Sequence, residues 1–213
     1  MGSEILLMTQ ITVNLIDELL REQDLEFRTE FESTNQLLHS TVSNAPEAEL
    51  LAAGERLIGS DAASQRILGI RLLRELKKLA GKATSDMAGL LHRERDDDVI
   101  YWIVSAFGFL RSDSVTSELI RLAAHSNPGV RYHVATALAN RSSGELPDES
   151  LAALTALASD ANAEVRFSAV FGLGSWWQVS HDPRIEAVLR NALGDGDPDV
   201  VGAARDALSE SGE

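Results

Sequence analysis

The sequence contains no cysteine, and this absence excludes several kinds of site at once. Without thiols the chain cannot form disulfides, thiolate zinc sites or a cysteine nucleophile. A chain free of cysteine also suits a reducing compartment, where disulfides are rare. We therefore expect the protein to be cytoplasmic.

Long hydrophobic runs are absent as well. No stretch approaches the ~18 consecutive apolar residues that a membrane-spanning helix needs. Residues 1–10 have neither the basic start nor the apolar run of a secretory signal peptide. We expect no membrane segment and no signal peptide.

Basic residues are scarce relative to acidic ones. Lys and Arg number 19 against 33 Asp and Glu, which gives a net charge of −14 at pH 7. The excess of acid lies in residues 1–58 (−8) and 145–213 (−9), whereas residues 59–144 carry +3. Because an acidic protein repels phosphate backbones, we do not expect nucleic acid as a partner. The charge either serves solubility alone or attracts a basic protein.

The sequence also lacks the motifs that usually mark a catalytic or metal site. It has no glycine-rich phosphate loop, no serine elbow and no pair of catalytic carboxylates. The histidines have no zinc spacing, and the acidic runs 96–98 and 195–199 lack the alternating ligands of a calcium loop. We interpret both runs as helix caps, and we expect no enzyme activity, no metal and no cofactor.

What the sequence does contain is an internal repeat. Four segments superpose without gaps: residues 96–107, 127–138, 162–173 and 197–208. The leading valine of each segment recurs at intervals of 31, 35 and 35 residues, as Val99, Val130, Val165 and Val200. A weaker fifth copy runs through residues 66–73.

Each copy has the pattern of an amphipathic helix. An Asp or Asn begins it, which is a preferred N-cap, and proline follows directly in two copies. Apolar or small residues then recur four, seven and eight positions after the valine, as Val134, Ala137 and Leu138 follow Val130. This spacing forms one face of a helix.

A leucine-rich stretch precedes each copy, so the pattern predicts pairs of helices. We expect no strands and five pairs, over residues 47–78, 83–111, 114–141, 148–177 and 182–210. Residues 1–46 lack the repeat and are predicted to form an N-terminal helical cap. The predicted organisation is a single continuous array over residues 47–213 that begins at this cap.

The segment Asp/Asn-x-x-Val-Arg-x-x-Ala-x-x-Ala-Leu, with a leucine-rich helix before it, resembles the HEAT repeat. It is most similar to the short bacterial kind that also occurs in the phycobiliprotein-lyase group. The resemblance covers about residues 47–210 and implies an all-α, right-handed α-solenoid. It also implies that the arginine after the valine joins neighbouring repeats through an acid in a turn. This arginine is present as Arg66, Arg131 and Arg166 and is replaced by Ile100 and Val201.

One face of the second helices offers candidate binding residues. Counted from the leading valine, the third and seventh positions of each copy lie off the core stripe, on the side that lines the concave face of such a stack. Aromatic side chains there could anchor a partner, or they could merely close gaps between helices. We predict a partner-binding ridge of Tyr101, Ser105, Tyr132, His133, Thr136, Phe167, Phe171, Trp176 and Trp177.

Three functions are compatible with these features. The first is a monomeric, non-enzymatic module that binds another protein, most specifically an acidic inhibitor or immunity-type protein for a basic partner. The second, implied by the resemblance, is a bilin lyase or isomerase in which Tyr101, Tyr132, His133 and Trp176 contact the chromophore. The third, a HEAT-like DNA glycosylase, is disfavoured by the shortage of basic residues.

Overall fold

The computed structural model describes residues 38, 43, 45–76, 78–140 and 145–209 of the chain. Every regular element in these residues is a helix, namely the α-helices α3 to α12 and one short 3-10 helix, η1. The prediction of an all-α fold without strands is confirmed for this part of the chain. Nearly all of the predicted cap over residues 1–46 lies outside the described residues.

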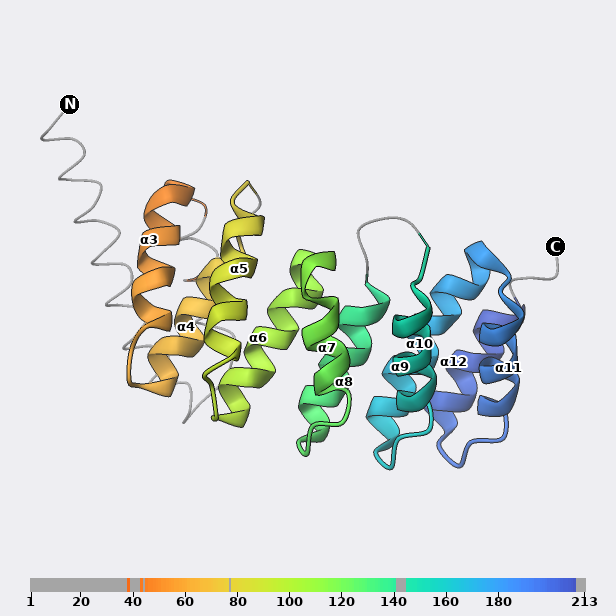
Figure 1. Ribbon diagram of the computed structural model, residues 1–213. Coiled ribbons are helices and arrows are strands. Elements are labelled where there is room, and N and C mark those ends of the chain that lie inside the picture. The colour runs from red at the N-terminus through yellow and green to blue at the C-terminus, as the bar shows by residue number, and fades with distance from the viewer. Residues whose placement is uncertain (1–37, 39–42, 44, 77, 141–144, 210–213) are drawn as a thin grey trace, which may run out of the picture. The chain divides into compact units, whose positions relative to one another are not determined.

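The helices come in the five predicted pairs (Figure 1). The pairs differ from the predicted ranges only by a few residues at their ends. They are α3 (Glu47–Ile58) with α4 (Ala63–Leu73), α5 (Ala80–Leu91) with α6 (Asp97–Leu110), η1 (Asp113–Val115) and α7 (Thr116–Leu122) with α8 (Pro128–Ala139), α9 (Asp148–Leu157) with α10 (Ala163–Ser180), and α11 (Pro183–Ala192) with α12 (Pro198–Ser209).

The chain divides into two compact units, Met1–Ala106 and Phe107–Glu213, and the division falls within α6. In the first unit, α3 packs along α4 and both helices contact α5. Leucine and methionine side chains fill the space between them, among them the fully buried Leu50, Leu68 and Met87. The single continuous array remains a prediction.

In the second unit, the second helices of successive pairs form the tightest layer. Helix α10 packs against α8 and α12 far more extensively than α9 packs against α7 and α11. The leading valines Val130, Val165 and Val200 have no exposed surface, so the apolar stripe of each copy is the core face, as predicted. A small side chain is needed where two of these helices meet, since a Cβ on Gly174 would lie 2.8 Å from that of Ala207.

The acidic runs cap helices, as predicted. Asp96 Oδ1 accepts hydrogen bonds from the backbone N–H groups of Asp98 and Val99, at 3.0 and 3.2 Å. Asp197 Oδ1 accepts in the same way from Asp199 at 3.0 Å, at the start of α12. The carboxylates thus satisfy N–H groups that have no partner inside the helix.

Two arginines of the second unit connect successive repeats. The Nε and Nη2 groups of Arg131 donate to the carboxylate of Asp160 at 2.7 and 2.8 Å, and its Nη1 group donates to the carbonyls of His125 and Ser126. Arg166 repeats the arrangement with Asp195, at 2.8 Å for both bonds. Each guanidinium therefore fastens the turn of its own pair to the turn of the next pair, as the resemblance implied.

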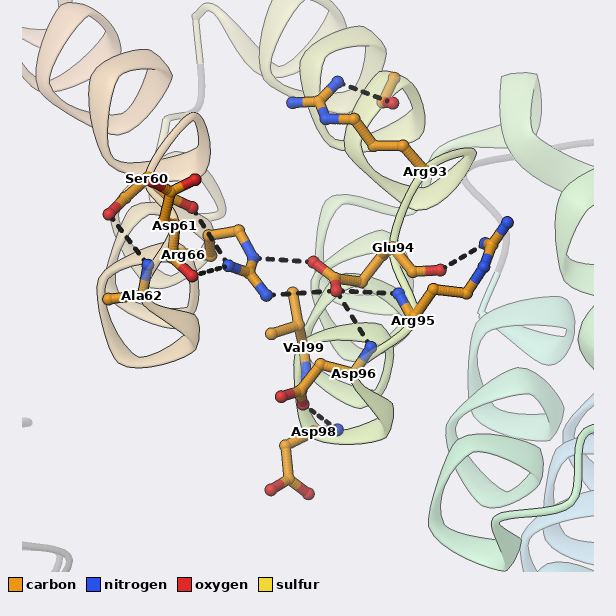
Figure 2. A network of polar contacts seen from close by, with 11 residues as sticks. Ser60, Asp61, Ala62, Arg66, Arg93, Glu94, Arg95, Asp96, Asp98 and Val99 are labelled. Atoms are coloured by element: carbon orange, nitrogen blue, oxygen red, sulfur yellow. Dashed lines mark hydrogen bonds and ion pairs between the residues drawn. The ribbon is translucent and has the colours of Figure 1, made fainter.

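The first unit contains the same device. Figure 2 shows Arg66 of α4 reaching Glu94 in the turn before α6, with bonds of 2.8 and 3.2 Å. Burial alone would raise the pKa of Glu94. The N–H groups of Asp96 and Arg95 and the Arg66 guanidinium outweigh that effect and lower the pKa. Glu94 is thus held as a carboxylate although it is buried.

These pairs predict a loss of stability in acid. The hydrogen bonds from Arg131 hold the pKa of Asp160 below its ordinary value of 3.8, and those from Arg166 do the same for Asp195. A carboxylate with a lowered folded-state pKa stabilises the fold above its unfolded pKa, and the stabilisation is lost as pH falls through the folded pKa. We therefore expect the free energy of unfolding to decrease progressively below about pH 4.

Urea unfolding of the wild type and Asp160→Asn between about pH 7 and about pH 3 tests this expectation. The variant is expected to be less stable at neutral pH and to lose less stability on acidification, because one of the titrating groups is gone. If the free energy of unfolding falls with pH by the same amount in the two proteins, Asp160 does not contribute to the acid sensitivity.

Candidate partner-binding groove

The second unit carries a groove of about 620 Å³ whose walls are α8 and α10. Arg111, the residue that follows α6, lies at its rim. Five of the nine residues predicted for the ridge line this groove, namely Tyr132, Thr136, Phe167, Phe171 and Trp176. Their partner-binding role stays a prediction.

Helical periodicity brings these side chains together. Tyr132 and Thr136 are four residues apart on α8, and Phe167 and Phe171 are four apart on α10, so each pair lies on one face of its helix. The two phenyl rings stack, with centroids 5.9 Å apart and planes inclined by 22°. Phe171 is nevertheless 62% exposed, and Val179 further along the same face is 74% exposed. One wall of the groove is therefore an exposed apolar surface.

Hydrogen bonds hold the floor of the groove. The hydroxyls of Thr136 and Ser168 lie 2.9 Å apart across the two helices, and Ser168 also donates to the carbonyl of Tyr132. The indole N–H of Trp176 donates to the carbonyl of Ala139 at 2.9 Å. Since that carbonyl belongs to the last turn of α8, it has no acceptor role within the helix. Trp176 thus both lines the groove and caps its neighbour.

Asn140 makes the equivalent bond one repeat earlier. Its side-chain amide donates to the carbonyl of Gly108 in the last turn of α6, at 2.9 Å. A backbone carbonyl at the end of α6 and one at the end of α8 each therefore accept a hydrogen bond from a side chain of the following repeat. This chain of bonds makes the groove a pre-formed feature rather than one that a ligand must organise.

Seven of the twelve described lining residues are absent from the predicted ridge, among them Arg111, Ser175 and Val179. Ser175 and Val179 could have been predicted from the sequence. They follow Phe171 at intervals of four residues and so continue the same helix face. Arg111 had no such signal. Its position depends on the turn that ends α6, where its φ is 52°.

Trp177 and His133 are predicted ridge residues of the second unit that are not among the described lining of the groove. Trp177 is only 8% exposed and its ring lies edge-on to His181, with centroids 5.1 Å apart, so it is buried beside the groove, and its partner-binding role stays a prediction. Adjacent positions on a helix point about 100° apart, and Trp176 and Trp177 therefore cannot share a face. His133 is half-buried beside the Tyr132 ring, and its burial lowers its pKa.

The remaining two, Tyr101 and Ser105, belong to the first unit. Both are half-buried there. The Tyr101 ring meets Trp102 edge-on at 5.8 Å, and the guanidiniums of Arg71 and Arg74 lie 5.5 and 5.7 Å from the Trp102 ring centroid. A ridge that extends over both units stays a prediction.

In the described part of the chain, no group of three or more His, Asp or Glu side chains is arranged to hold a metal ion. None of the helices described is long and apolar enough to span a bilayer.

Comparisons with known proteins agree with the repeat architecture. A profile of HEAT repeats matches residues 87–174 and 151–213. Among solved structures, the complex of CpcE and CpcF of phycocyanin lyase from Nostoc sp. PCC7120 is 18% identical with a TM-score of 0.61, and covers 76% of this chain and 99% of that chain. A comparison with curated proteins gives no match.

Designed proteins are similar in fold as well. A designed armadillo repeat protein in complex with the peptide (KR)4 is 14% identical with a TM-score of 0.59, and covers 91% of this chain and 98% of that chain. An engineered protein is 19% identical with a TM-score of 0.54, at coverages of 91% and 96%. At such identities the likeness concerns the fold alone. Together with the profile it confirms the predicted repeat type and the predicted α-solenoid.

Proposed function

The chain belongs to the family of HEAT-repeat proteins, and from this premise we propose that it is a non-enzymatic module that binds another protein in the groove of its second unit. HEAT repeats suggest a protein-interaction scaffold. The observation that carries the proposal is the exposure of Phe171 and Val179 on the wall of a pre-formed groove. Covering a phenylalanine side chain releases about 1.5–3 kcal/mol, enough to anchor a contact.

The lining of the groove supports binding rather than catalysis. The described lining residues include no histidine and no carboxylate, and the only charged one is Arg111. Histidine and the carboxylates are the groups that most often serve as the general acid or base in catalysis. We therefore propose a binding function without turnover, for a monomer in the cytoplasm.

Retention of a partner by matched variants tests this function. Immobilised wild-type protein is exposed to lysate of the native host, beside Phe171→Ser in the groove and Leu193→Ser, which changes an apolar residue 40% exposed after α11. We expect one protein to be retained by the wild type and by Leu193→Ser and to be reduced at least about tenfold by Phe171→Ser. Equal retention by all three would assign these rings to packing alone.

A finer proposal is that the partner is basic and that the chain acts as an acidic inhibitor or immunity-type protein. It is supported by the net charge of −14 and by the excess of acid in residues 145–213, which would steer a basic protein toward the second unit. A protein of similar fold holds the basic peptide (KR)4. Since no acid is among the described residues that line the groove, the attraction would act on the encounter and the aromatic wall on the residence time.

The finer proposal has its own test. The association rate of the retained partner is expected to fall steeply as salt rises from low to physiological concentration, because salt screens charges beyond a Debye length. An association rate that does not change with salt concentration would contradict the proposal of a basic partner. It would not affect the broader proposal that the chain binds a protein.

A bilin-handling protein remains the alternative, supported by the structural likeness to a phycocyanin lyase complex and by the aromatic wall of the groove. Incubation with a linear tetrapyrrole should then change its visible absorbance, and Trp176→Phe should reduce that change. An unaltered spectrum would end this alternative without affecting the first.

A further inference from the structure

We propose that the groove receives a partner segment in which an apolar side chain lies on Phe167 and Phe171 while a neighbouring carboxylate pairs with Arg111. The proposal rests on the proposed function, because it states which kind of segment the same groove selects. It is carried by the position and surroundings of Arg111 in the groove.

Arg111 is the only charged residue among the described lining of the groove. It is exposed, and its guanidinium has no hydrogen bond or ion pair with the described part of the chain. The three arginines that follow the leading position of a repeat copy are, by contrast, all engaged with acids, as Arg131 is with Asp160. Arg111 therefore has its donors available at the rim of an apolar surface, where a carboxylate is the complementary group.

The backbone at Arg111 adopts a conformation that is uncommon for arginine. With φ at 52° it occupies the left-handed region directly after α6, and the N–H of Ser112 points back to the carbonyl of Phe107 at 3.5 Å. Glycine is the usual residue at this position of a helix end, because it alone adopts the conformation without strain. The chain instead carries arginine there, at a steric cost, and so places a guanidinium at the groove.

The two sides of the groove are therefore complementary to different chemical groups of a ligand. The stacked rings of Phe167 and Phe171 offer a flat apolar surface, and Arg111 offers five N–H donors in a planar fork. An acidic segment with several carboxylates would be repelled by the net charge of −14. A single acid beside an aromatic or aliphatic residue satisfies both conditions, and such a segment can belong to a partner that is basic overall.

Selection from a phage library of random dodecapeptides tests the proposal on the full chain. Three variants are compared with the wild type: Arg111→Glu, Arg111→Gly and Leu193→Ser. Peptides selected on the wild type and on Leu193→Ser are expected to carry Asp or Glu next to an aromatic or aliphatic residue. Their affinity should fall at least about tenfold for Arg111→Glu, and selection on that variant should favour Lys or Arg at the same place.

Arg111→Gly guards against a folding defect. Glycine suits the left-handed conformation, so this variant is expected to unfold no more easily than the wild type and still to lose the preference for acid. Selected peptides without that preference, a preference that survives in Arg111→Gly, or a library that yields no peptide at all would each overturn the proposal. If the selected peptides are apolar, lose their binding to Phe171→Ser and bind equally well to the Arg111 variants, the proposal is overturned. The proposed function would then still stand.

Discussion

Arg131→Leu is expected to lower the free energy of unfolding by about 3 kcal/mol. The substitution removes two bonds to Asp160 and two to the carbonyls of His125 and Ser126, and so removes the polar link between the turns of successive repeats. It also leaves the carboxylate of Asp160, whose side chain is 11% exposed, without its cation. An ion pair left half-made in this way costs about 3–5 kcal/mol when fully buried, and the partial exposure reduces that value.

The matched control is Arg190→Leu on α11. Arg190 also pairs with an acid, Glu186 one turn away, but its side chain is 67% exposed. A solvated pair of this kind contributes about 0.3–0.5 kcal/mol, and the control should therefore be nearly as stable as the wild type. Arg131→Lys should fall between them, because an ammonium cannot make the forked contact. Urea unfolding of the three variants measures the series, and equal losses for Arg131→Leu and Arg190→Leu would contradict the connecting role.

The fold could be predicted because its core positions repeat. A valine recurring near every 35 residues and followed by apolar positions at helical spacing fixes which face of each helix is buried, and Val130, Val165 and Val200 are indeed without exposed surface. The arginine that follows in two of these copies could be assigned by resemblance, since its partner acid also recurs in the turns. Because the pattern is repeated, each structural assignment is supported by several copies in the sequence.

The division of the chain was beyond the same reasoning. Sequence periodicity continues through α6, yet the two units separate within this helix. The arginine–acid pairs lie within the units, Arg66 with Glu94 in the first and Arg131 with Asp160 in the second. The copy in α6 has Ile100 in place of the arginine, and an aliphatic side chain cannot make the pair. The replacement was visible in the sequence, but the division into two compact units was not.

The groove was predictable only where its residues repeat. Tyr132 with Thr136 and Phe167 with Phe171 follow from position within the copy, and all four line the groove. Trp176 and Trp177 lie beyond the repeat, where the sequence alone did not decide which ring faces out. Only the structure shows Trp176 bonded to Ala139 on the groove and Trp177 in the core. Arg111 depends on one backbone angle, which no periodicity encodes.

Gly172→Ala is expected to lower the free energy of unfolding by about 1–2 kcal/mol, against the usual trend for such a change. Replacing glycine by alanine inside a helix ordinarily stabilises by about 0.5–1 kcal/mol. At this position, however, the new methyl group would overlap the Cβ atom of Ala139 on α8. That atom is attached directly to the helix backbone and cannot rotate away, so α8 and α10 must move apart, at a cost of about 1–3 kcal/mol.

Gly202→Ala on α12 provides the same chemical change in the same unit without the obstacle. No atom lies within 4 Å of the position that its Cβ would take, so the variant should gain the helix-propensity benefit and unfold at higher urea concentration than the wild type. If the two substitutions change the free energy of unfolding in opposite directions, α8 and α10 pack so closely that no methyl group can be added between them. Because Ala139 also supplies the carbonyl that Trp176 binds, Gly172→Ala should weaken the floor of the groove and reduce partner retention, whereas Gly202→Ala should leave retention unchanged. Equal stabilisation by both would mean that the helices separate freely, and that the groove between them is not pre-formed.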